Sequence, residues 1–125
     1  MRLWSGTVAD FTIVDDAQLQ HFASTHEFVG QDHGTEISFI LVDMPPGDGV
    51  RLHRHPYPEV FIVQEGRATY RVGSERVEVT APRTLIVPAG VAHGFRNSGD
   101  ARLKQVDIHL SPKFITEWLE PDARR

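Results

Sequence analysis

The 125-residue sequence contains no cysteine, and this absence removes several kinds of chemistry at once. Without thiols the protein can form no disulfide, no zinc–thiolate site and no cysteine nucleophile. An excess of positive charge is also missing, since 13 basic residues against 17 acidic ones give a formal net charge of −4. This balance offers no basic surface to the phosphates of a nucleic acid, so we expect no nucleic-acid partner.

The sequence also lacks long apolar runs, internal repeats and heptads. Residues 1–10 mix Arg, Trp, Ser and Asp, which is typical of neither a signal peptide nor a membrane span. A chain of 125 residues suits one domain with a hydrophobic core. We therefore expect a single domain over residues 1–125 in a cytoplasmic protein with no membrane contact.

Short β-rich segments alternate with Gly, Pro and Asn clusters, a pattern typical of an all-β sandwich or barrel. The segments predicted as strands are 36–42, 50–55, 59–64, 68–72, 76–80, 84–87, 92–96 and 102–110. A C-terminal helix is expected over 111–120, because Ser111-Pro112 suits a helix start and an apolar stripe follows. A weaker helical pattern covers 16–24. The prediction is an all-β domain with short terminal helices.

Seven histidines are present, and the spacing of His53 and His55 is informative. Residues two apart in a strand share a face, with Cα atoms roughly 6.6 Å apart. Pro56 and Pro58 force a turn, after which Glu59 can return beside the two imidazoles. These groups are either unrelated polar residues on a solvated face or ligands of one cation, and their clustering favours the metal site.

Two longer motifs carry a family resemblance. The segment Gly47-x5-His53-x-His55-x3-Glu59-x6-Gly66 resembles the first motif of the cupin superfamily at each position. The segment Pro88-x-Gly90-x2-His93-x3-Asn97 resembles most of the second motif. The second motif, taken as 82–97, departs at Pro82, where glycine is usual; this position serves a turn and is not a ligand.

The resemblance implies a double-stranded β-helix, the jelly-roll barrel of small single-domain cupins. It implies that His53, His55, Glu59 and His93 hold one divalent transition metal, which could be Fe, Mn, Ni, Zn or Cu. Open coordination positions would suit a small anionic or enolisable substrate, for dioxygenase-type or isomerase, lyase or cyclase chemistry. The alternatives are a non-catalytic module that binds a small ligand or a metal, and a structural barrel with an empty site.

Several neighbours of these residues allow two interpretations each. Alternation puts Arg51 on the face of His53, where it either pairs with a substrate carboxylate or, as we slightly favour, reaches solvent. Tyr57 either covers the entrance or, the favoured reading, lies in a surface turn. The row Gln105, Asp107 and His109 either orients a ligand and supplies an acid and base, or is simply solvated, which we favour.

Apolar residues also occupy the opposite rows of the same predicted strands. Val60 and Ile62 alternate with the predicted inward positions of one strand, and Val106 and Ile108 with the polar row of the last. These apolar rows must be shielded from water, and we expect the terminal segments to bury part of them. A surplus of two-sided apolar strands is compatible with a homodimer.

Overall fold

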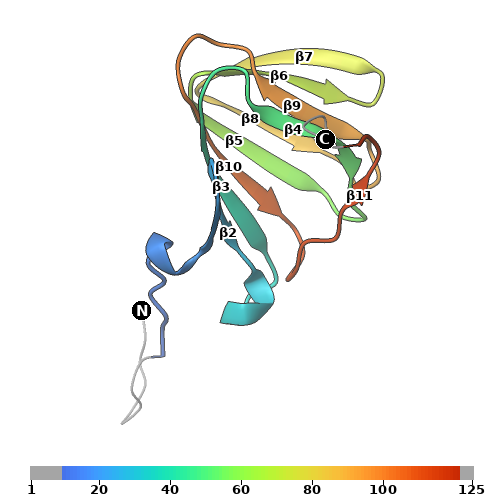
Figure 1. Ribbon diagram of the computed structural model, residues 1–125. Helices are drawn as coiled ribbons and strands as arrows, with labels where there is room; N and C mark the ends of the chain where they lie inside the picture. The colour runs from blue at the N-terminus through green and yellow to red at the C-terminus, as the bar shows by residue number, and fades with distance from the viewer. Residues whose placement is uncertain (1–9, 122–125) are drawn as a thin grey trace.

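The computed structural model describes residues 10–121, which form two antiparallel sheets. The six-stranded sheet has the order β1-β2-β3-β10-β5-β8, and the five-stranded sheet has the order β11-β4-β9-β6-β7. Figure 1 shows the two sheets as facing layers, with β11 beside the end of β4. The strands are β1 (Gln20–Phe22), β2 (Thr25–Phe28), β3 (Ser38–Met44), β4 (Gly49–Arg54), β5 (Glu59–Glu65), β6 (Arg67–Val72), β7 (Glu75–Thr80), β8 (Arg83–Val87), β9 (His93–Asn97), β10 (Leu103–His109) and β11 (Glu117–Trp118).

The predicted all-β class is confirmed, and the eight predicted strands correspond to β3 through β10. Period-two alternation decides which side chains enter the space between the sheets. In β5, for example, Phe61 and Val63 are buried while Val60 and Ile62 lie on the outer surface, half-buried. Phe61 packs there with residues of both sheets, which are Val42, Met44, Val63, Ala68, Tyr70, Val79, Val87, Phe95 and Leu103.

The predicted C-terminal helix over 111–120 is wrong. This segment is extended, and β11 pairs with β4 through Glu117 opposite Arg54 and Trp118 opposite His53. The N–H of Leu119 then donates to the carbonyl of Leu52 at 2.9 Å. Without β11, β4 would be an edge strand with unpaired backbone groups, and pairing with it outweighs a local helical pattern.

The predicted helix over 16–24 is also wrong in most of its length. A 3-10 turn, η1 (Asp16–Gln18), is capped by the Asp15 side chain, and the chain then enters β1. Another 3-10 turn, η2 (Gly30–His33), follows β2. No helix within residues 10–121 is long and apolar enough to cross a membrane. The cytoplasmic location stays a prediction.

A β-bulge in β4 changes which side chains share a face. Val50 lies opposite Phe95 and His53 lies opposite His93, so three steps along β4 match two along β9. One extra residue on β4 breaks the alternation between Val50 and His53. Val50 and His53 therefore both face inward, and Arg51 does not take the face that simple alternation gives it.

Candidate metal centre

Four side chains from β4, β5, β9 and the turn after β4 meet inside the molecule. His53 lies opposite His93 in the β4–β9 pair, His55 follows the end of β4, and Glu59 opens β5. Each offers one ligand atom, and these atoms all lie within 4.8 Å of one another. The residue exposures are 5% for His53, 3% for His55, 2% for Glu59 and 2% for His93. We refer to these four residues as the His/Glu cluster.

Backbone carbonyls fix which ring nitrogen carries a hydrogen in all three imidazoles of the cluster. Each Nδ1 lies within hydrogen-bonding distance of one carbonyl oxygen: 2.7 Å from His53 to Arg51, 2.9 Å from His55 to Ile115, and 2.9 Å from His93 to Val91. A carbonyl oxygen only accepts, so Nδ1 must carry the hydrogen. In a neutral ring Nε2 then keeps a free lone pair, which is the form that binds a metal.

The carboxylate of Glu59 lies among these nitrogens. Its Oε1 is 3.1 Å from Nε2 of His55 and 3.0 Å from Nε2 of His93. Burial alone would raise the pKa of Glu59, but the contacts with His109, His55 and His93 outweigh it and hold the pKa well below its usual range. Glu59 is therefore an anion at neutral pH.

The cluster fits a divalent cation on two observations. Burial lowers the pKa of His53 to about 4, so this imidazole is neutral at neutral pH and able to ligate. Within residues 10–121, Nε2 of His55 is buried and has no hydrogen-bond partner, although Oε1 of Glu59 is near. A buried polar atom without a partner is costly, and a cation would satisfy it. Imidazole with carboxylate suits first-row transition metals.

Arg51 is half-buried and turned away from the face of His53, which alternation predicts that the two residues share. Its guanidinium lies over the ring of Trp118 at 4.0 Å, and its Nε–H donates to the backbone oxygen of Glu120 at 2.8 Å. The bulge in β4 is the reason that it does not point into the centre beside His53. It is half-buried at the edge of the sheet.

The polar row of β10 faces the interior, so the favoured solvated interpretation is wrong. Gln105, Asp107 and His109 are 1%, 4% and 3% exposed. They lie opposite Val63, Phe61 and Glu59 of β5, and residues paired across two strands share a face. The residues of β10 that alternate with them face outward. The signal that could have revealed this was the register with β5, which aligns His109 with Glu59.

Inside the core this row forms a hydrogen-bonded chain. The hydroxyl of Tyr70 donates to Gln105, whose Nε2 donates to Oδ1 of Asp107 at 2.8 Å. Burial, and then the negative charge of Glu59, raise the pKa of Asp107 well above its usual range. Asp107 therefore retains its proton in conditions that ionise an exposed aspartate, which keeps a second negative charge away from the cluster.

Tyr57 is also buried, at 8% exposure, so the favoured reading of a surface turn is wrong. Its hydroxyl oxygen lies 2.7 Å from Nδ1 of His109 and accepts the N–H of Ile115 at 3.2 Å. The C-terminal segment, residues 111–121, covers it. That segment contacts the centre at two further points, with the ring of Phe114 4.8 Å from His109 and that of Trp118 5.0 Å from His53. No local sequence pattern predicts these contacts.

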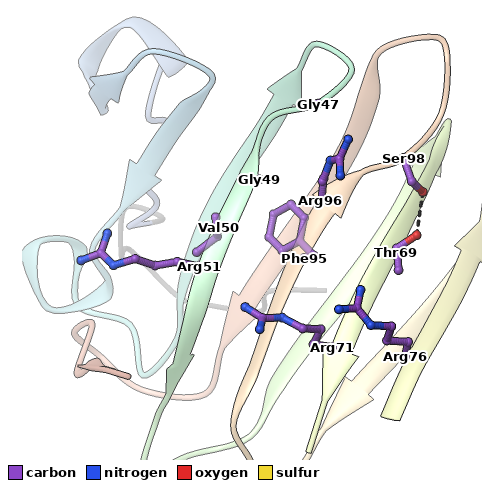
Figure 2. Close-up of a pocket in the computed structure, with 10 residues that line it drawn as sticks. All are labelled: Gly47, Gly49, Val50, Arg51, Thr69, Arg71, Arg76, Phe95, Arg96 and Ser98. Atoms are coloured by element: carbon purple, nitrogen blue, oxygen red, sulfur yellow. Dashed lines mark hydrogen bonds between the residues drawn. The ribbon is translucent and has the colours of Figure 1, made fainter. Parts of the chain in front are cut away.

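Two hollows lie near Arg51. A groove of about 570 Å³ runs between the β1–β2 turn and β4, lined by apolar side chains that include Phe22, Met44, Val50 and Trp118, with Arg51 as its cation. A second hollow, of about 360 Å³, is lined by Arg51, Arg71, Arg76 and Arg96. Figure 2 shows Arg51 pointing away from the other three arginines. Arg51 thus lines the groove next to Trp118.

Two facing antiparallel sheets with an interior cluster of three imidazoles and one carboxylate define the class of jelly-roll proteins with a potential metal site. The cupin domain family matches residues 40–109, which is more than half of the chain. This protein belongs to the cupin family. The expected fold family is therefore confirmed, and both predicted motifs lie within the match.

Relatives of known name share this region. Polyketide synthase CurC of Streptomyces cyaneus is 40% identical over 73 residues, covering 58% of this chain and 47% of its own. Auxin-binding protein 4 of Zea mays is 33% identical over 89 residues, covering 63% and 44%. The chain thus spans about half the length of the curated relatives it matches.

Solved structures agree on the fold. The oxalate decarboxylase of Lactobacillus farciminis, solved as a formate complex, superposes with a TM-score of 0.70 at 21% identity, over 81% of this chain and 33% of that one. A double-stranded β-helix protein of Klebsiella pneumoniae gives a TM-score of 0.63 at 23% identity, over 69% and 72%. At these identities the likeness concerns the fold, which is the predicted double-stranded β-helix.

Proposed function

We propose that the protein binds one divalent transition-metal ion on His53, His55, Glu59 and His93 and acts as a metal-dependent enzyme on a small anionic or enolisable organic molecule. The observation that carries the metal site is the shared orientation of the three imidazoles. Every Nδ1 is bound to a backbone carbonyl, so each ring in its neutral form turns the lone pair of Nε2 toward the Glu59 carboxylate.

Other residues of the chain bind the substrate and support the acidic side chains in and near the cluster. The bound ion would act as a Lewis acid on a substrate oxygen. Arg51 lines the groove beside Trp118, and we propose that its guanidinium nitrogens beyond Nε pair with an anionic group of the substrate. Gln105 and His109 act from the interior, Gln105 by holding Asp107 and His109 by contacting Glu59.

The relatives support a small-molecule ligand without naming it. One is named as a polyketide synthase and another as auxin-binding, and one structural neighbour is an oxalate decarboxylase whose Mn(II) centres have been studied. These proteins differ in chemistry, so dioxygenase-type oxidation and isomerase, lyase or cyclase chemistry both remain in the proposal.

The experiment begins with metal content by elemental analysis. Wild-type protein should carry one equivalent, and His53→Ala should carry almost none while keeping its β-sheet circular dichroism. His21→Ala is the matched control, because His21 is exposed and remote from the cluster in the chain. Equal metal content in wild type and His53→Ala would contradict the proposed site.

A non-catalytic binding module is the second candidate, and the burial of the cluster favours it. All four side chains are at most 5% exposed, and the C-terminal segment lies over them. Oxygen uptake and loss of enolisable acids, measured on metal-loaded protein, separate the two. Turnover that disappears in His53→Ala supports the enzyme, whereas stable metal and ligand binding with no turnover supports the module.

We also propose that the protein forms a homodimer through the outer face of the six-stranded sheet. Ile86, Val60, Ile108 and Phe39 form one row across β8, β5, β10 and β3, according to the strand registers. Ile86 is 65% exposed. An apolar row of this length across four strands is costly in water, and a two-fold partner presenting the same row would cover it.

A further inference from the structure

Four histidines surround Glu59, but one of them has a different environment from the other three. His53, His55 and His93 each direct Nδ1 at a backbone carbonyl. Nδ1 of His109 instead faces the hydroxyl of Tyr57 at 2.7 Å. A hydroxyl can donate as well as accept, so the backbone does not force the hydrogen of His109 onto Nδ1.

The surroundings of Tyr57 decide the direction of that hydrogen bond. The N–H of Ile115 donates to the Tyr57 oxygen at 3.2 Å, which leaves the hydroxyl hydrogen in need of an acceptor. Nδ1 of His109 is the acceptor within reach among the described residues. Because Nδ1 of His109 accepts this hydrogen bond, the ring hydrogen of His109 lies on Nε2, which removes the lone pair that a metal would need.

The Nε2 atom of His109 is directed at the far oxygen of Glu59. It lies 3.1 Å from Oε2, whereas Oε1 is the oxygen near His55 and His93. Nε2 is buried and forms no hydrogen bond within residues 10–121, and Oε2 of Glu59 is the carboxylate oxygen that it faces. The ring is held in place by His55 at 4.6 Å and Phe114 at 4.8 Å, both edge-on.

We propose that His109 is a positioning residue of the metal centre: its Nε2–H binds Oε2 of Glu59 and leaves Oε1 as the single oxygen for the ion, and Tyr57 sets the tautomer. This inference depends on the proposed metal site. It makes the centre a three-histidine, one-oxygen site and excludes His109 as a fifth ligand. His109, outside both cupin motifs, and Tyr57, at an unspecified position of the first, thus control how the motif glutamate binds.

The test uses Mn(II) as the probe, in titrations followed by electron paramagnetic resonance. His109→Leu removes the N–H and should weaken Mn(II) binding by roughly 10- to 100-fold, the range for loss of a partner of a metal ligand. Its spectrum should change because Glu59 can then offer both oxygens. His109→Gln retains an N–H donor and should restore most of the affinity and the wild-type spectrum.

Tyr57→Phe tests the tautomer, and Tyr70→Phe is its matched control, because Tyr70 loses a buried hydroxyl that contacts Gln105. Tyr57→Phe should alter the Mn(II) spectrum and Tyr70→Phe should not. A wild-type spectrum in Tyr57→Phe would overturn the tautomer assignment. Unfolding temperatures of the metal-free variants show whether any loss is only a loss of fold.

Two further results would overturn the inference. Wild-type affinity and spectrum in His109→Leu would mean that His109 has no positioning role. Failure of His109→Gln to rescue, with nitrogen hyperfine coupling from a fourth imidazole in the wild type, would mean that His109 is a ligand. If wild-type protein binds no Mn(II) and no other transition metal, the proposed metal site itself fails, which separates the two claims.

Discussion

At the scale of single residues, the interior of this protein holds two carboxyl groups whose pKa values are shifted in opposite directions. Glu59 is surrounded by imidazole nitrogens, which hold its pKa below the usual range against the effect of burial. Within the described residues, Asp107 accepts a hydrogen bond from the neutral amide of Gln105, and burial together with the charge of Glu59 raises its pKa. The different partners, and not depth alone, shift the two pKa values in opposite directions.

This assignment predicts a pH effect on stability. The folded state holds the Asp107 proton more tightly than the unfolded chain does. The contribution is complete below about pH 3.8, the ordinary pKa of the group, and is lost as pH rises toward the raised folded value. Asp107→Asn is neutral at every pH, so its stability relative to wild type should increase by about 1.4 kcal/mol per pH unit in that window.

Urea unfolding of metal-free protein, carried out from pH 5 to pH 8, measures this difference. A difference in unfolding free energy that stays constant with pH would mean that Asp107 is ionised in the folded state throughout. If folded Asp107 loses its proton between pH 5 and pH 8, the difference in unfolding free energy between the two proteins should level off toward pH 8.

The sequence predicted the His/Glu cluster at this scale because strand periodicity and the two motifs both concern local spacing. It did not predict the environments of His109 and Asp107. A polar row in a strand predicts a solvated face, but the face of β10 is decided by its pairing with β5. Register between strands is a long-range property that polarity alone does not reveal.

At the scale of elements, the C-terminal segment is held on the barrel by charged contacts. Arg71 binds both oxygens of Glu120, at 2.6 and 2.9 Å, and the N–H of Leu52 donates to Oε1 at 3.0 Å. Arg54 pairs with Glu117 at 2.9 Å. These contacts fix Trp118 beside His53 and so join the segment to the centre.

Glu120→Ala should release this segment. Hydrogen exchange of residues 115–120 at pH 7 should become several-fold faster, because the contacts with Arg71 and Leu52 are lost. Glu75→Ala, at an exposed position of β7, is the control. Exchange that matches the wild type would show that β11 pairing alone holds the segment.

The contact of Glu120 with Arg71 and Leu52 also predicts that the C-terminal segment is released at acid pH. The Arg71 guanidinium and the Leu52 N–H lower the pKa of Glu120 to about 2. The stabilising contact is therefore complete above about pH 4.5 and is lost as pH falls toward 2. Trp118 fluorescence in a Trp4→Phe background should change in that range for wild type, and should already be changed at pH 6 in Glu120→Ala.

The helix prediction for this segment failed for a physical reason. Ser111-Pro112 and the apolar spacing after it are compatible with a helix, but they say nothing about the open edge of β4. The side chain and backbone of Glu120, together with Trp118, find partners on β4 and β6 that lie about 50 to 70 residues away in sequence. Distant partners of this kind outweigh a local propensity.

At the scale of the whole molecule, the two sheets have different outer surfaces. The outer face of the six-stranded sheet carries the apolar row that includes Val60, Ile86 and Ile108. The five-stranded sheet instead presents Arg71, Arg76 and Arg96 around a hollow. Only the first face is suited to burial against a second copy of the chain.

Ile86→Lys should therefore give a monomer. Light scattering after size-exclusion chromatography should show a dimer mass for the wild type and half of that mass for the variant. Because Ile86 is largely exposed within one chain, the variant should retain its fold. Thr80→Lys, at an exposed position of the other sheet, should leave the dimer intact. A monomeric wild type would contradict the proposed interface.

The central claim is that the His/Glu cluster binds one metal ion, and anomalous diffraction from crystals of the metal-loaded protein tests it most directly. The account predicts a single peak at the absorption edge of the metal, bonded to Nε2 of His53, His55 and His93 and to one oxygen of Glu59. An anomalous peak at another place, or none at this cluster, would contradict it.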